Sequence, residues 1–190
     1  EEDTPEFWVE YNSYRVWQKG GQILAGAILG TSISALVGIV FLFVRNVLPE
    51  GNNIKKTFIL SGLMWFTIFV IPFLKYPANP PTVGETETVL IRGILFVSFI
   101  AISGLGAIAF YQVYKKLHNR KILGFVGYAI FITVAFFLMP ENPDEITAPM
   151  ELVDGFRGAS FIAVSLYWLT LALILGGFIE KLQERLHLKE

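Results

Sequence analysis

Two arginines, Arg92 and Arg157, each stand where a long apolar segment begins, and each follows two carboxylates (Glu85 and Glu87; Glu151 and Asp154). A lone cation at the edge of a bilayer is costly unless it is paired or reaches water. Two interpretations follow. These groups are structural clamps that fix their loops, or they form, with Lys75, the rim of an outer vestibule that gathers a cation. The residues alone leave both open.

Oxygen ligands for a divalent cation are available in the same loops, because Asn79 and Asn142 lie among several carboxylates. The alternative is an ordinary solvated acidic surface. His118 and His187 do not help, since both lie among basic residues away from these loops. The residues that would hold a metal are therefore left unassigned.

Catalysis is not predicted. The chain has no cysteine, which excludes disulfides, thiolate metal sites and cysteine nucleophiles. No nucleophile with a base, phosphate loop, dinucleotide fingerprint or zinc-type spacing is present. We expect a protein that is not an enzyme, carries no cofactor and binds no nucleic acid.

The segments that must position these side chains are long and apolar. Of 190 residues, 54% are hydrophobic and 16% are charged, as is typical of a chain in lipid. We predict an all-α integral membrane protein with a transmembrane domain at 22–180, in five helices at about 22–44, 57–74, 89–114, 122–139 and 158–179. An acidic, aromatic outer interfacial arm precedes it at 1–21, and an inner tail follows at 181–190. A further helix or signal sequence ahead of Glu1 is left open.

Charge decides the orientation. With the amino terminus outside, the inner side holds ten of the fifteen basic residues and four of the sixteen acidic ones. The outer face then carries a net charge of −7 and the inner face +6, which satisfies the positive-inside tendency. We expect a multi-pass protein of the cell membrane with its amino terminus outside and its carboxyl terminus inside.

An internal repeat relates the two outer loops. Each copy has Pro-x-Asn-Pro (Pro77, Asn79 and Pro80; Pro140, Asn142 and Pro143), then Arg-Gly, then Ser-Phe-Ile-Ala. We predict two parallel helical hairpins plus one extra helix, related by an axis near the membrane normal, an arrangement that transporters use and that structural proteins also use.

Small residues recur every fourth position in the first helix, at Gly26, Gly30, Ser34 and Gly38. This spacing lets membrane helices approach closely. Packing against another helix, in this chain or in a second subunit, is the main interpretation, and lining of a pore is the alternative.

The run Leu74-Lys75-Tyr76-Pro77-Ala78-Asn79-Pro80-Pro81-Thr82-Val83-Gly84, with Thr88 and Arg92, resembles the outer loop of the CbtA-type family of probable cobalt transporter subunits. Phe156 to Ser160 resembles that family's closing loop and last helix, and Arg15 to Gly38 its stretch after a first helix. The resemblance implies a membrane subunit of a divalent metal-cation transporter, with cobalt as the implied ion and a small histidine-bearing partner.

A second hypothesis comes from another class of protein. Long apolar helices without catalytic groups also suit a non-catalytic accessory or structural subunit of a larger membrane complex. Under both hypotheses the partners are membrane lipids and other membrane subunits.

Overall fold

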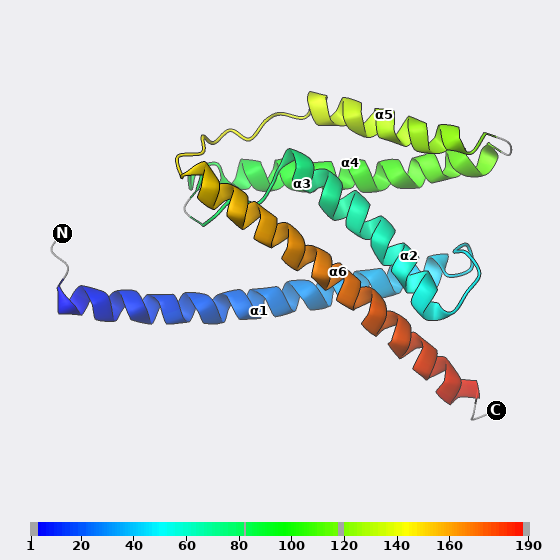
Figure 1. The fold of residues 1–190 in the computed structure, drawn as a ribbon, viewed down its shortest axis with the longest axis horizontal. Helices are drawn as coiled ribbons and strands as arrows, with labels where there is room; N and C mark the ends of the chain where they lie inside the picture. Colours follow the sequence, from blue (N-terminus) through cyan, green and yellow to red (C-terminus); the bar gives the residue numbers. More distant parts are fainter. Residues whose placement is uncertain (1–3, 82, 118–119, 188–190) are drawn as a thin grey trace.

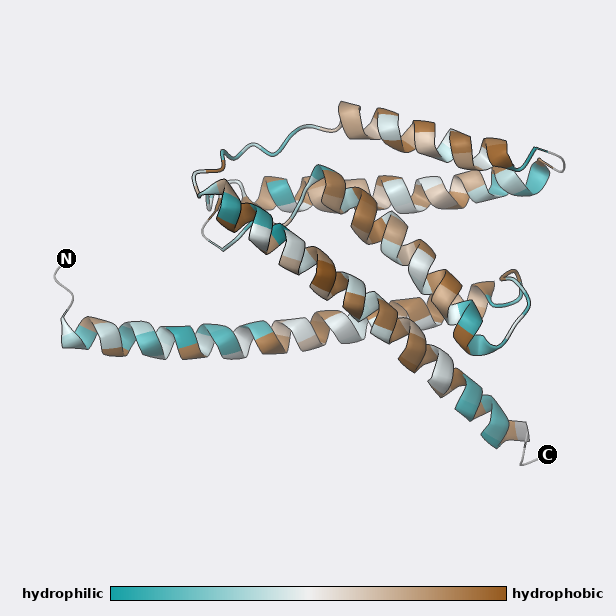
Figure 2. Cartoon of the chain, in the orientation of Figure 1, coloured by the Kyte–Doolittle hydropathy of each residue, from teal (hydrophilic) through white to brown (hydrophobic). Residues whose placement is uncertain are grey.

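The computed structural model describes residues 4–81, 83–117 and 120–187, and within these residues the chain is helical, with no strand. Four helical stretches are long and apolar enough to cross a membrane, and the shorter α5 (Ile122–Leu138) is also apolar. The predicted all-α class with five helices is confirmed. Figure 2 shows hydrophobic residues along the middle of the bundle and hydrophilic ones toward both chain ends.

Helix α1 (Pro5–Val44) is one continuous helix of 40 residues, about 60 Å long at 1.5 Å per residue. Thr4 caps its start by accepting a hydrogen bond from the Phe7 N–H at 3.3 Å. The expected change at residue 21 from arm to helix is not present, because Gly20 and Gly21 continue the helix. Its first turns project beyond the rest of the bundle (Figure 1). Residues 1–3 of the arm lie outside the described residues, and an interfacial role for the arm stays a prediction.

The second span begins at Asn53, four residues earlier than expected, because Asn52 caps it by accepting from the Lys55 N–H at 3.0 Å. It consists of α2 (Asn53–Trp65), a π-helical turn (Phe66–Val70) and α3 (Ile71–Lys75). Pro72 explains the wide turn, since its ring has no N–H to donate and clashes with the carbonyl four residues earlier. The N–H of Ile71 instead bonds to the Phe66 carbonyl, five residues back.

Helix α6 (Met150–His187) begins eight residues before the predicted start at 158 and ends eight after the predicted end. The N–H groups of Leu152 and Val153 bond to the Pro149 carbonyl, and Val153 is fully buried. The sequence-based boundary was wrong because the acidic residues there were assigned to the loop. Carboxylates are in fact favourable in a first helical turn. Helix α4 (Val89–Lys116) and α5 end within two residues of their predicted bounds.

The helices pair across the two repeats. Helix α2 packs most extensively on α6, and α4 packs on α5 (Figure 1). In each pair the second helix of one repeat lies against the first helix of the other. Ser103 and Ser165 follow the two Ser-Phe-Ile-Ala runs at the same spacing. Ser103 bonds to Tyr128 of α5 at 2.9 Å, and Ser165 accepts from Trp65 of α2 at 3.1 Å.

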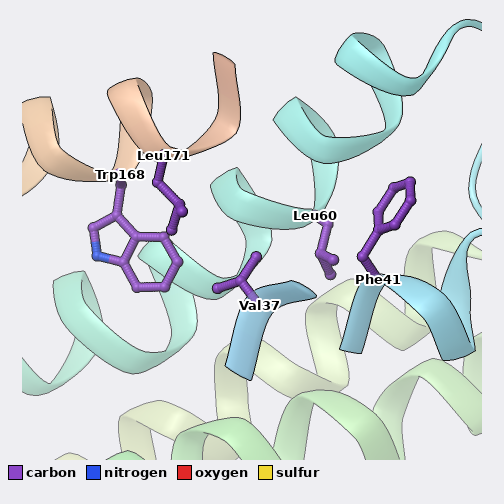
Figure 3. Packing of buried hydrophobic residues seen from close by; sticks show 5 residues of the cluster. All are labelled: Val37, Phe41, Leu60, Trp168 and Leu171. Atoms are coloured by element: carbon purple, nitrogen blue, oxygen red, sulfur yellow. The ribbon is translucent and has the colours of Figure 1, made fainter. Parts of the chain in front are cut away.

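A buried hydrophobic cluster lies where the carboxyl-terminal half of α1 meets α2 and α6 (Figure 3), and it consists of Val37, Phe41, Leu60, Trp168 and Leu171. Nearby, Tyr167 donates to the Gly30 carbonyl at 2.8 Å and lies 3.2 Å from the Ser34 hydroxyl. This part of the predicted small-residue face therefore packs on a helix of the same chain. Around Gly26 and Gly38 there is space for a side chain.

Candidate functional site

The two loops that we predict to lie outside, residues 76–88 and 139–149, are fastened to each other, and we keep the name outer loops for them. The Tyr76 hydroxyl donates to the Pro140 carbonyl, and burial raises the pKa of Tyr76 above its ordinary value. Beside it the Lys75 ammonium lies 4.9 Å from the centre of the Phe136 ring, a cation–π contact. Residues 76–88 and 139–149, with the Lys75 and Phe136 side chains beside them, therefore form one group over the helix ends, which we call the outer cluster.

Asp144 is the centre of this cluster. Its side chain is only 3% exposed, and its Oδ2 lies 2.9 Å from Nε of Arg92. The same oxygen accepts from the Glu85 N–H at 3.1 Å, and Arg92 donates to the Glu85 carbonyl at 2.9 Å. Oδ1 is buried with no hydrogen-bond partner among the described residues. We call Gly84, Glu85, Arg92 and Asp144 the Asp144 clasp.

Gly84 makes this close approach possible. Its φ is +101°, in the region that favours glycine. A Cβ there would lie 2.7 Å from Nη1 of Arg92 and closer still to Oδ2 of Asp144. The loop backbone can lie against the ion pair only because residue 84 has no side chain.

Arg157 makes a second contact across the repeats. Its guanidinium donates to the side-chain oxygen of Asn79 at 2.9 Å, and its other nitrogen lies 3.7 Å from the largely exposed Asp154 carboxylate. We call Asn79 and Arg157 the Asn79 clasp. Its exposed ion pair contributes little to stability, so the hydrogen bond to Asn79 is the contact that ties α6 to the first outer loop.

The two clasps are reciprocal: an arginine of each repeat binds the loop of the other repeat. The two arginines do not occupy the same position relative to the Ser-Phe-Ile-Ala runs. Arg92 lies six residues before Ser98, whereas Arg157 lies three residues before Ser160. Three residues are nearly one helical turn. The two arginines therefore correspond in the order of the repeat but are offset from each other by nearly one helical turn.

The structure brings together only some of the predicted site residues. Glu85, which was proposed as an ionic partner of Arg92, binds it through its backbone carbonyl. The ionic partner of Arg92 is Asp144 of the other loop. Glu87 and Glu151 are exposed, and neither makes an ion pair within the described part of the chain. Asn142 accepts from the N–H of Asp144 at 3.2 Å.

The prolines of the two loops direct the course of the backbone, and their side chains offer no polar group. Pro80 is buried and its carbonyl accepts from the Val83 N–H at 3.1 Å, while Pro77 is half-buried. Pro140 and Pro143 are exposed. Sequence reasoning gave no individual site role to Asp144, Tyr76 or Gly84, although Tyr76 and Gly84 lie in the run that resembles the CbtA-type loop. The one signal for Asp144 is its place directly after Asn142-Pro143.

A second polar feature lies at the opposite end of the bundle, near the carboxyl terminus. It is an open recess of about 840 Å³ between the loop after α1 and the end of α6. Arg45, Lys56, Glu180 and Glu184 line it, so its cationic and anionic side chains balance. A recess of mixed charge does not concentrate ions of one sign. Within the described residues, three or more His, Cys, Asp or Glu side chains do not gather into a metal-holding group.

Five apolar helices with fastened outer loops define a polytopic membrane protein. The profile of the CbtA family, described as "Probable cobalt transporter subunit (CbtA)", matches residues 1–180. The chain belongs to this family and is thus a membrane transporter subunit that functions with other subunits. No curated protein and no solved structure matches it significantly.

Proposed function

We propose that this chain is the non-catalytic permeation scaffold of a divalent metal-cation transporter, with cobalt(II) as the ion that the family description indicates. The outer cluster is the entrance, on the side of the membrane where we place the amino terminus. Lys75, Arg92, Arg157 and four carboxylates (Glu85, Glu87, Glu151 and Asp154) shape it around Asp144.

The observation that carries this proposal is the buried Asp144 carboxylate. One of its oxygens is engaged by Arg92 and Glu85, and the other lacks a hydrogen-bond partner in the described chain. A cation can compete with the arginine for such a carboxylate, since divalent cations favour carboxylate and carbonyl oxygens. Displacement of Arg92 would break the ion pair that holds α4 to the second outer loop. The net charge of −7 assigned to the outer face attracts cations to the entrance.

The test is cobalt(II) uptake by cells that produce the complete transporter with Asp144→Asn in this chain. The amide oxygen can still accept from the Glu85 N–H. Arg92 keeps its bond to the Glu85 carbonyl and its side chain is 26% exposed, so we expect near-normal folded protein. Loss of the charge should lower the initial uptake rate per folded transporter by about tenfold or more. Glu145→Gln, an exposed neighbour in the same loop, is the matched control and should leave uptake unchanged.

A purely structural clasp predicts the reverse result. Asp144→Asn would then lower the unfolding temperature and the folded yield, while uptake per folded transporter stays at the wild-type rate. That outcome would remove the entrance from the proposal and favour the accessory-subunit hypothesis.

A further inference from the structure

Four basic side chains lie where α4 ends and α5 begins, at the end of these helices away from the outer cluster. We call Lys115, Lys116, Arg120 and Lys121 the basic turn. All four are exposed, and Figure 2 shows the turn as a hydrophilic tip on two largely hydrophobic helices. The sequence has no Asp or Glu from residue 88 to residue 140. Within residues 4–81, 83–117 and 120–187, no ion pair or side-chain hydrogen bond engages any of the four cations. The basic turn is therefore an accessible patch of positive charge without an anionic partner in the described chain.

The two lysines at the start of α2 differ in this respect. The Lys55 ammonium donates to the Glu50 carbonyl at 3.0 Å, and the Lys56 ammonium donates to the Arg45 carbonyl at 3.1 Å. Lys56 also lines the recess that two carboxylates of α6 share. Positive charge at this end of the bundle is thus partnered within the chain at α2 and left open at the basic turn.

Two tyrosines hold ammonium groups at the basic turn. The Lys115 ammonium lies 5.8 Å from the centre of the Tyr111 ring, and the Lys121 ammonium lies 5.4 Å from the centre of the Tyr114 ring. The two rings are stacked, with centroids 6.3 Å apart and planes at 15°. Gly124 of α5 packs against Tyr114, where an added Cβ would lie 3.0 Å from the tyrosine Cβ. A cation–π contact orients an ammonium and still leaves N–H donors for another ligand.

The surface beside the basic turn is apolar and faces lipid. Ile122 and Phe125 follow the turn directly and are 66% and 63% exposed, and Val113 before it is 43% exposed. Helix α4 has 28 residues and is about 42 Å long, which exceeds the roughly 30 Å of the hydrocarbon layer. Its charged end therefore reaches the headgroups, where tyrosine rings are also favoured. A phospholipid can place its phosphate on the cations and its acyl chains on the apolar side chains, whereas a soluble anion meets only the cations.

We propose that the basic turn binds the phosphate of an anionic phospholipid, whose acyl chains lie along Ile122 and Phe125. Charge complementarity selects a headgroup with a net negative charge, because a zwitterionic headgroup carries its own cation beside the phosphate. Each Lys or Arg near an anionic membrane surface strengthens binding about fivefold. The inference does not depend on which ion is transported or on the assigned orientation, since both leaflets present phosphates.

The first test is native mass spectrometry of the purified full chain with phosphatidylglycerol and with phosphatidylcholine of the same acyl chains. We expect the chain to retain phosphatidylglycerol at a concentration at least tenfold lower than phosphatidylcholine. Inorganic phosphate and glycerophosphoglycerol, which lack acyl chains, should not displace it at the same concentration. Equal retention of the two lipids, displacement by either soluble anion, or recovery of an acidic protein with no bound phosphatidylglycerol would overturn the proposal.

The second test removes two charges of the basic turn. Lys115→Gln with Lys121→Gln should weaken phosphatidylglycerol binding at least tenfold. Without lipid the unfolding temperature should not change, because neither lysine has an ionic partner in the described chain. Added phosphatidylglycerol should raise the unfolding temperature of the wild type and not that of the variant.

Arg15→Gln with Lys19→Gln is the matched control, because both residues are exposed on α1 and the change in net charge is the same. It should leave phosphatidylglycerol affinity at the wild-type level. An equal loss in both variants would show a general attraction between charges and refute a site at the basic turn. If the cation–π contacts prove necessary for folding, Lys116→Gln with Arg120→Gln provides the same comparison and should also weaken binding at least tenfold.

Discussion

At the scale of single residues, the outer cluster depends on contacts between residues far apart in sequence. The sequence identified Arg92 as a cation in need of a partner and offered its nearest carboxylates. The structure pairs it with Asp144, from the other loop. Such a pairing cannot be read from one sequence, because which loops meet is decided by helix packing and not by local spacing.

Gly84 gives the sharpest test at this scale. Gly84→Ala forces a side chain into a φ of +101° and against the Arg92–Asp144 pair, so we expect a loss of about 1–3 kcal/mol in the free energy of unfolding. Gly93→Ala, on α4 with open space around it, should be neutral or stabilise by up to about 1 kcal/mol. Thermal unfolding in detergent compares the two. Equal effects would show that residue 84 does not need glycine.

At the scale of elements, periodicity and length were enough to find the helices but not their ends. The apolar runs fixed the centres of all five spans. The starts of α2 and α6 were missed because the residues that begin them are polar, with Asn52 as a cap and Glu151 in a first turn. The π-helical turn before Pro72 was also missed, although a proline within a span predicts some interruption there.

Helix pairing can be tested at Gly176. An added Cβ there would lie 2.7 Å from the Cα of Ile54 and closer to the Thr57 hydroxyl. Since the Ile54 backbone cannot move without shifting α2, Gly176→Ala should cost about 1–3 kcal/mol of stability. Gly177→Ala has no atom within 4 Å and should show no loss. A retained unfolding temperature in the Gly176 variant would mean that α2 and α6 do not pack this closely.

At the scale of the whole molecule, orientation in the membrane follows from the charge distribution and stays a prediction. The absence of cysteine from the sequence makes single-cysteine labelling possible without background. In intact cells, a membrane-impermeant thiol reagent should label Ser13→Cys in α1. It should label Glu184→Cys in α6 only after permeabilisation. The opposite pattern would reverse the assigned orientation and move the outer cluster to the cytoplasm.

The reciprocal clasps and the exchanged helix pairs imply a history for this molecule. If each hairpin were a separate chain, the contacts Ser103–Tyr128, Ser165–Trp65, Arg92–Asp144 and Arg157–Asn79 would all run between two subunits. Fusion of duplicated genes that encoded a homodimer would leave this pattern. The difference between Phe110 and Ala172, each seven residues after the equivalent serine, would then record a later loss of symmetry.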